Sequence, residues 1–344
     1  MGVDAGAGAL TPRARQDLDE DDIRVRPGRG SRPRTRRRPA HEDAVEGFVA
    51  SVDRGRYGVL VGERVITAMQ ARELGRHGVV VGDLVALAGD TSGAPGTLAR
   101  VVRVSPRSTV LRRSADDSDP VERVIVANAD QMCIVCALAD PPPRPRFIDR
   151  CLVAAYDAGL RPLLCLTKAD LASADELLHA YAPLGIGHVV LGRPLDAATL
   201  APVRQHLEGR ISVLIGHSGV GKSTLVNALI PDADRAVGAV NAVTGRGRHT
   251  SSSAVALALP GGGWIIDTPG LRGFGLGHVA PDRVVRAFTD LVPGIAACPS
   301  GCDHDQPDCA LDDWVRDQGS DPRLAARLDS LRRLLRSRDG AESW

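Results

Sequence analysis

The sequence has no long apolar run and few aromatic residues. No stretch reaches the roughly 18 consecutive apolar residues of a membrane-spanning helix, so the sequence excludes a protein that crosses a membrane. The first 22 residues contain no apolar segment of the kind found in secretory signals, and we expect a cytoplasmic protein without a membrane partner. Aromatic residues make up 3% of the chain, so the core is expected to consist mainly of Val, Leu, Ile and Ala.

Lysine is also nearly absent. Lys168 and Lys222 are the two lysines among 43 basic residues, and the others are arginine. Lysine carries a compact charge on a flexible stem, which arginine cannot reproduce. We therefore expect specific roles for these two positions.

The N-terminal segment, residues 1–43, has an uneven charge distribution. Residues 17–22 read DLDEDD, and residues 24–38 then carry eight arginines among Pro, Gly and Ser. This composition cannot bury enough apolar surface to offset the loss of chain entropy, so it predicts a disordered tail. The arginines could bind nucleic-acid phosphates or could simply keep the tail solvated, and the sequence leaves both interpretations open.

The remaining chain divides into three parts, and together they predict an α/β protein. Residues 44–114 contain short apolar runs separated by glycine, which is typical of an OB-type β-barrel that binds RNA or docks a protein. In residues 115–278 apolar runs alternate with helical stretches, which predicts βα units around a mainly parallel sheet. Residues 279–344 carry cysteines and end in an amphipathic helix over residues 322–338.

A phosphate-binding motif occupies residues 216–223. Its sequence, GHSGVGKS, matches the pattern GxxxxGK[ST] between an apolar run and a helical stretch. The glycines let backbone N–H groups close around phosphate oxygens, and the helix N-terminus adds a favourable dipole. Lys222 is expected to neutralise the β- and γ-phosphates and Ser223 to bind Mg²⁺, while His217 is expected only to fill the loop.

A second element, DTPG at residues 267–270, follows the apolar run GWIID. It resembles the DxxG element of GTPases, in which the aspartate holds Mg²⁺ through water and the glycine N–H contacts the γ-phosphate. A polar, glycine-rich segment precedes it, and Thr250 in that segment is expected to complete the magnesium shell. The expected magnesium residues are Ser223, Thr250 and Asp267.

The segment TKAD, residues 167–170, resembles the guanine-recognition element [NT]KxD. Asp170 would accept hydrogen bonds from two donors of guanine that adenine cannot offer together, and the stem of Lys168 would cover the base. Thr167 stands where Asn is usual, which predicts weaker bracing of this loop. Residues 192–194 read Gly-Arg-Pro, and we assign no second guanine contact there because proline has no N–H to donate.

The base-recognition element precedes the phosphate loop, whereas it follows that loop in ordinary GTPases. This order predicts a circular permutation of the GTPase domain. The expected GTP-binding residues are Thr167, Lys168, Asp170, Gly216, Ser218, Gly219, Val220, Gly221, Lys222, Ser223, Thr224, Asp267 and Gly270.

A cluster of metal-ligand residues lies near the C-terminus. Cys298, Cys302, His304 and Cys309 fall within twelve residues, a spacing that is typical of structural zinc sites. Four protein ligands leave no position for water, so we expect one structural zinc ion and no catalysis by zinc.

Together these segments resemble one family, the bacterial ribosome small-subunit-dependent GTPase A, which is a circularly permuted GTPase. The resemblance runs from about Val45 to beyond Cys309 and includes the segments VANAD, FIDR, LTKADL, GHSGVGKST, GRGRHTS and DTPG. It implies an N-terminal OB-fold, a central GTPase domain and a C-terminal zinc domain. It also implies binding to the small (30S) ribosomal subunit and its 16S rRNA, with GTP hydrolysis stimulated there during late maturation. The shortened cysteine spacing and the arginine-rich tail depart from the family pattern.

The catalytic residues are less evident. Leu271 follows DTPG at the position where Ras-like enzymes place a water-orienting glutamine, so slow intrinsic hydrolysis is expected. We hypothesise that His249 supplies the polar group, as the family resemblance also suggests, which gives Lys222, His249 and Thr250 as catalytic residues. Two alternatives stay open: a GTP-switched rRNA-binding module with little hydrolysis, and an ATPase or small-molecule kinase, against which Asp170 argues. Nothing demands a dimer, so a monomer that exchanges GTP and GDP is expected.

Overall fold

The computed structural model describes residues 41, 43–74, 78–113, 123–231, 233, 254–268, 276, 278–319 and 321–338. The predicted disordered tail therefore lies outside the described residues, apart from residues 41 and 43. His249, Thr250, Gly270 and Leu271 lie outside them as well. No helix within the described ranges is long and apolar enough to cross a membrane.

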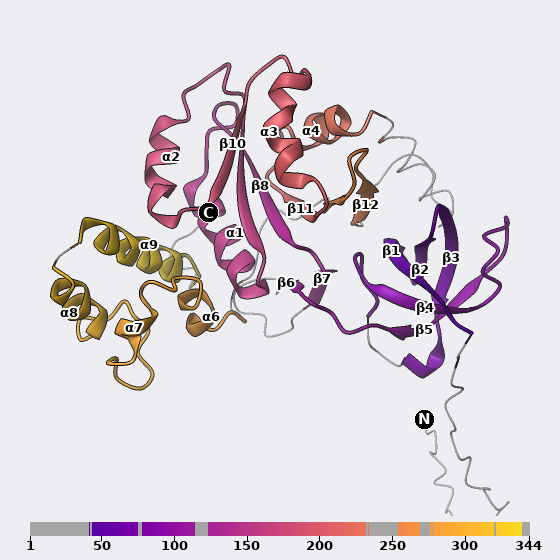
Figure 1. Cartoon of the computed structure of the whole chain (residues 1–344), viewed down its shortest axis with the longest axis horizontal. Coiled ribbons are helices and arrows are strands. Elements are labelled where there is room, and N and C mark those ends of the chain that lie inside the picture. The colour runs from indigo at the N-terminus through magenta and orange to yellow at the C-terminus, as the bar shows by residue number, and fades with distance from the viewer. Residues whose placement is uncertain are drawn as a thin grey trace, which may run out of the picture. The chain divides into compact units, whose positions relative to one another are not determined.

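The first folded part is a closed five-stranded barrel, as the sequence predicted (Figure 1). Its strands are β1 (Val45–Asp53), β2 (Arg56–Val61), β3 (Arg64–Gln70), β4 (Leu84–Gly89) and β5 (Ala99–Val104). They follow the order β1–β2–β3–β5–β4, and β4 closes the barrel by pairing with β1. Val59, Ile66, Leu87 and Val101 are fully buried between the strands, because alternate side chains of a strand point to the same face. A short 3₁₀ turn, Arg72–Leu74, follows β3.

The second part contributes six strands in the order β10–β9–β8–β11–β13–β12 (Figure 1), and its edge strand β12 continues the sheet into the barrel by pairing with β1 at Ser51 and Val255. Its strands are β8 (Gln131–Ala137), β9 (Arg161–Thr167), β10 (Gly187–Leu191), β11 (Ile211–Ile215), β12 (Val255–Ala258) and β13 (Trp264–Asp267). Every neighbouring pair is parallel except β12 with β13. The mainly parallel sheet predicted from the alternating apolar runs is confirmed.

Helices cover both faces of this sheet (Figure 1). They are α1 (Pro145–Ala158), α2 (Asp175–Tyr181), α3 (Ala197–Leu207) and α4 (Lys222–Leu229), and a 3₁₀ turn, Ala182–Leu184, follows α2. Buried side chains of α1 and α2 share one apolar cluster, and those of α3 and α4 share the other. α1 begins with proline at its first turn and ends at Gly159, whose left-handed backbone lets its N–H bond the last carbonyls.

One apolar run lies outside the parallel sheet, contrary to the sequence-based expectation. The segment VIVANA forms β7 (Arg123–Ala127), which pairs in antiparallel fashion with β6 (Val110–Arg113) as a separate two-stranded sheet. The side chain of Asn128 explains how this ribbon ends: its amide donates to the carbonyl of Gly82 and its Oδ1 accepts from the N–H of Ser108. These contacts join segments that are distant in sequence, so no local pattern could indicate them.

The C-terminal part is helical. It contains α6 (Pro281–Val285), α7 (Val292–Ile295), α8 (Ala310–Asp317) and α9 (Pro322–Arg338). The amphipathic helix predicted over residues 322–338 is therefore confirmed. Leu328, Leu331 and Leu335 of α9 are buried, in the same apolar cluster as α1. Arg150 on α1 also donates to the carbonyl of Ser337 at 2.7 Å, so α9 is held against the sheet domain by both apolar and polar contacts.

Candidate functional site

Three of the sequence motifs meet at one edge of the parallel sheet. The TKAD segment begins at the end of β9, the phosphate loop follows β11, and DTPG begins at the end of β13. Carboxyl ends of parallel strands point to the same edge, and ligands of open α/β sheets bind there. The permuted chain order therefore still brings together the segments predicted to recognise the base and to bind the phosphates.

The phosphate loop requires glycine at defined places. A Cβ added at Gly216 would lie 2.4 Å from the carbonyl oxygen of Val135, so only glycine fits beneath the loop. Gly219 and Gly221 have φ values of 81° and 93°, in the left-handed region that favours glycine. The Nζ of Lys222 donates to two loop carbonyls, Gly216 at 2.5 Å and His217 at 2.9 Å. This places the ammonium group inside the loop, where phosphate oxygens are expected.

The carboxylate of Asp267 lies close to this lysine. Burial raises the pKa of Asp267, and the positive charge of Lys222 opposes that shift only in part. Burial likewise lowers the pKa of Lys222. The Oδ1 atom of Asp267 is buried and has no hydrogen-bond partner among the described residues. A buried, unpaired carboxylate oxygen beside a phosphate loop fits a ligand of Mg²⁺ or of its water shell.

The first residue of TKAD braces this loop to the phosphate loop. Thr167 is buried, and its Oγ1 lies 2.7 Å from the carbonyl oxygen of Val220 and 3.4 Å from that of Cys136. The sequence predicted that threonine would weaken this brace. The threonine hydroxyl forms the brace, because the loops approach closely at Gly221, where an added Cβ would be 3.7 Å from the Thr167 hydroxyl. That this brace is weaker than one made by asparagine stays a prediction.

The other two residues of the element are held by loops that the sequence did not point to. Lys168 has a left-handed backbone, with φ of 59°, and its Nζ donates to the carbonyl of Asp140. Oδ1 of Asp170 accepts from the backbone N–H of Arg193 at 3.1 Å. The Gly-Arg-Pro turn thus positions the carboxylate that the sequence predicts to recognise the base. Its residue types gave no signal for this role, since the contact uses only the backbone.

Ser223 and Thr224 lie in the exposed first turn of α4. Ser218 and Gly219 are exposed as well, whereas Val220 is buried. The described site therefore brings together the expected residues of the TKAD segment, the phosphate loop and Asp267. One residue that the sequence missed, Thr268, secures the end of β13 by donating to the carbonyl of Leu214 at 3.1 Å.

The Cys₃His group forms a compact cluster that could hold a metal ion. The ligand atoms of Cys298, Cys302, His304 and Cys309 all lie within 4.8 Å of one another. Cys298 Sγ is 3.6 Å from His304 Nδ1 and 3.9 Å from Cys309 Sγ. Tetrahedral ligands about 2.3 Å from a central ion would be about 3.8 Å apart, so these separations suit a four-coordinate metal.

A neighbouring arginine supports the backbone of this cluster. Arg332 of α9 donates from Nε to the carbonyl of His304 at 3.1 Å, and its two terminal nitrogens bond Asp312 at 2.8 and 2.6 Å. His304 itself has a left-handed backbone, with φ of 62°. The cluster is thereby tied to α8 and α9, a connection that the cysteine spacing alone did not indicate.

Comparison with known proteins decides the family. The family model described as RsgA GTPase matches residues 104–277. The chain belongs to the RsgA GTPase family. It is therefore a GTP hydrolase. The small ribosomal subunit biogenesis GTPase RsgA of Pseudomonas aeruginosa is 40% identical over 245 residues, which cover 69% of this chain and 70% of that protein. Its counterpart from Ectopseudomonas mendocina is 41% identical over 246 residues, 69% of each chain.

Two solved structures share the fold of this RsgA-family chain. YjeQ from Thermotoga maritima superposes with a TM-score of 0.60 at 24% identity, covering 87% of this chain and all of that one. YloQ, described as a circularly permuted GTPase, superposes with a TM-score of 0.59 at 22% identity over 86% of this chain and 96% of its own. The predicted architecture of barrel, permuted GTPase domain and helical region with a Cys₃His cluster is confirmed.

Proposed function

We propose that this GTPase binds the small (30S) ribosomal subunit through its 16S rRNA and hydrolyses GTP faster when bound, during late maturation of that subunit. The supporting observation is that base-recognition, phosphate and magnesium elements meet at one edge of a permuted sheet, in a chain whose relatives are named as small ribosomal subunit biogenesis GTPases. Because its partner is the small ribosomal subunit, the protein acts in the cytoplasm.

The individual residues take roles that follow from their chemistry. Asp170 accepts hydrogen bonds from guanine and so selects GTP over ATP. Lys222 neutralises the β- and γ-phosphates, and Ser223 and Asp267 hold Mg²⁺ together with Thr250. His249 orients the attacking water when the subunit is bound. The full set of GTP-binding residues is the one predicted from the three motifs, including Gly270.

The Cys₃His cluster binds one zinc ion with a structural role. Thiolate and imidazole ligands at this spacing favour zinc over Mg²⁺ or Ca²⁺, which prefer oxygen.

The chain consists of a tail and three domains. The tail covers residues 1–43, the barrel residues 44–114, the GTPase domain residues 115–278 and the zinc domain residues 279–344. The protein acts as a monomer. A molar mass of one chain in solution is the expected measurement.

The direct test is GTP turnover with and without purified small ribosomal subunits. Turnover is expected to rise at least about tenfold with the subunits, because Leu271 cannot orient water in the free protein. A His249→Ala variant is expected to lose this stimulation while binding GDP normally. Turnover that is equal with and without subunits would contradict the proposal.

The sequence after DTPG favours a second candidate, a GTP-switched rRNA-binding module with little hydrolysis. Leu271 is the observation that supports it. Such a module would bind small subunits with different affinities in its GTP and GDP forms and would show no stimulated turnover. Co-sedimentation with small subunits in each nucleotide state distinguishes the two functions.

A further inference from the structure

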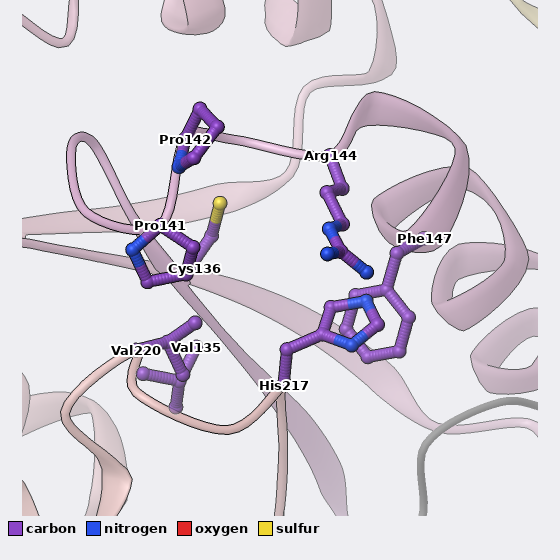
Figure 2. Close-up of a pocket in the computed structure, with 8 residues that line it drawn as sticks. All are labelled: Val135, Cys136, Pro141, Pro142, Arg144, Phe147, His217 and Val220. Carbon is purple, nitrogen blue, oxygen red and sulfur yellow. The ribbon is translucent and has the colours of Figure 1, made fainter. Parts of the chain in front are cut away.

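A small pocket lies between the phosphate loop and the start of α1. Its lining includes Pro141 and Pro142 from the loop after β8, Arg144 and Phe147 from the start of α1, and His217 from the phosphate loop (Figure 2). The guanidinium of Arg144 points toward the rings of Phe147 and His217 in this view. The pocket thus connects an arginine side chain to the loop that receives the phosphates.

Arg144 occupies a position where arginine has no structural reason to be. It is the N-cap residue of α1, a position that favours Ser, Thr, Asp or Asn, and its side chain makes no capping hydrogen bond. The helix starts instead with Pro145. Arg144 is exposed and has no carboxylate partner among the described residues. Neither capping nor an ion pair within the described chain explains this residue.

His217 belongs to the phosphate loop and also lines the pocket that contains Arg144. The carbonyl of His217 accepts from the Nζ of Lys222 at 2.9 Å, and its imidazole packs on Phe147 with ring centroids 4.0 Å apart. Burial lowers the pKa of His217, and the charges of Arg144 and Lys222 lower it further. Protonation of this imidazole is therefore disfavoured near the two cations. An anion placed at the loop would attract both.

We propose that Arg144 contacts the terminal phosphate of bound GTP and stabilises the charge that develops during hydrolysis. In the reaction the water oxygen bonds to the γ-phosphorus, the bond from that phosphorus to the β–γ bridging oxygen breaks, and the water proton ends on the released phosphate. Negative charge spreads over the bridging and γ-oxygens, where an arginine supplied within the same chain is effective. Phe147 and His217 position the guanidinium. The inference rests on GTP hydrolysis by the chain itself and not on stimulation by the ribosomal subunit.

The test uses the full chain without ribosomal subunits and separates catalysis from stability. Arg144→Ser removes the charge but supplies a preferred capping residue, so thermal stability is expected to be kept or raised. Arg144→Lys keeps a charge without the bidentate geometry. Arg161→Ala is the matched control, because Arg161 is an exposed residue at the opposite end of β9 from Thr167. Each variant is assayed for single-turnover GTP hydrolysis and for affinity to GDP and to a non-hydrolysable GTP analogue.

Arg144→Ser is expected to hydrolyse GTP at least about tenfold more slowly, to bind the analogue several-fold more weakly, and to bind GDP as the unsubstituted chain does. Arg144→Lys is expected to have a hydrolysis rate and an analogue affinity between those of Arg144→Ser and the unsubstituted chain. Arg161→Ala is expected to change neither quantity. Equal hydrolysis and equal analogue affinity in Arg144→Ser would overturn the proposal, and so would a loss of GDP affinity as large as that of the analogue. An unsubstituted chain that binds GTP without hydrolysing it would contradict the GTPase function instead. In that case the two affinities alone would decide the role of Arg144.

Discussion

The hydroxyl of Thr167 lies 2.7 Å from the carbonyl oxygen of Val220 and donates a hydrogen bond to it. This bond joins the TKAD segment, predicted to recognise the base, to the phosphate-loop motif, although 53 residues separate the two positions. Because the Thr167 hydroxyl is buried, a water molecule cannot replace it as the donor to Val220 without a cost in free energy. This side chain therefore helps to fix the position of the TKAD segment relative to the phosphate-loop motif.

Replacing Thr167 by valine keeps the shape and removes the donor. The carbonyl of Val220 is then left unsatisfied in a buried place, which costs about 1 to 2 kcal/mol and weakens GDP binding roughly 5- to 30-fold. Thr167→Asn is expected to retain affinity, since its amide also donates. Fluorescent GDP titration measures both. Thr97→Val is the control, because Thr97 donates to a carbonyl in an exposed barrel turn, and an equal loss in this variant would contradict the prediction.

The sequence predicted the elements better than their contacts. The barrel, the parallel sheet, the phosphate loop and α9 each have a local signal, such as strand alternation, a glycine pattern or a helical apolar stripe. The hydrogen bonds from Lys168 to Asp140 and from Arg193 to Asp170 have none, because one partner in each is a backbone group of a distant loop. Such contacts follow from the packing of the strands, which residue types alone do not specify.

The same reason explains why the sequence placed the segment VIVANA in the parallel sheet. β7 has the apolar composition of a buried strand, yet it pairs with β6 outside the parallel sheet. Composition indicates a strand but does not say which edge it joins. For His217 the motif gave no reason to expect more than a loop filler, and its contact with Phe147 became visible only when α1 was in place.

The magnesium-binding role proposed for Asp267 predicts a pH dependence of magnesium binding. Burial raises the pKa of its carboxyl above the ordinary value near 3.9, and Mg²⁺ binds only the ionised form. Magnesium-dependent GTP turnover is therefore expected to be lost as the pH falls through this raised pKa, before exposed aspartates become protonated. Titrating Mg²⁺ at a series of pH values checks this.

Asp267→Asn is the informative variant for the same titration. It is expected to need far more Mg²⁺ for turnover at neutral pH and to lose the acidic limb that belongs to this carboxyl. Asp175→Asn is the control, since Asp175 is an exposed residue at the start of α2. An unchanged magnesium requirement in Asp267→Asn would exclude this residue from the metal shell.

The Cys₃His cluster is expected to contain one zinc ion per chain. Cys309→Ser removes a buried ligand, so bound zinc should fall to near zero, and the midpoint of thermal unfolding should drop by roughly 5 °C or more because metal binding contributes to folding. Elemental analysis and calorimetry measure the two effects. Cys151→Ala is the control: Cys151 is buried in α1, so this variant is destabilised by a cavity but keeps its zinc. Full zinc content in Cys309→Ser would reject the assignment.

Two ion pairs in the C-terminal part differ in length and in exposure. The longer but less exposed pair is expected to contribute more to stability. Arg316 and Asp313 are 2.5 Å apart, with side chains 68% and 75% exposed, whereas Arg327 and Asp290 are 2.8 Å apart, at 18% and 38%. Exposed pairs gain little because water screens them and ordering the side chains costs entropy. Arg327 makes a two-bond contact with Asp290 and also lies 4.6 Å from the ring centre of Phe288.

Arg327→Ala is therefore expected to lower the free energy of unfolding by about 1 to 3 kcal/mol, and Arg316→Ala by less than about 0.5 kcal/mol. Arg327→Lys should lose part of this stability, because an ammonium group cannot form two parallel bonds to a carboxylate. Arg327 also donates to the carbonyls of Pro183 and Leu184 at 3.0 and 3.2 Å, so its loss should loosen α9 from the turn after α2. Denaturant unfolding and proteolysis near α9 measure both consequences. Equal effects of the two alanine variants would contradict the prediction, and a larger effect of Arg316→Ala would mean that pair length, and not burial, decides the contribution.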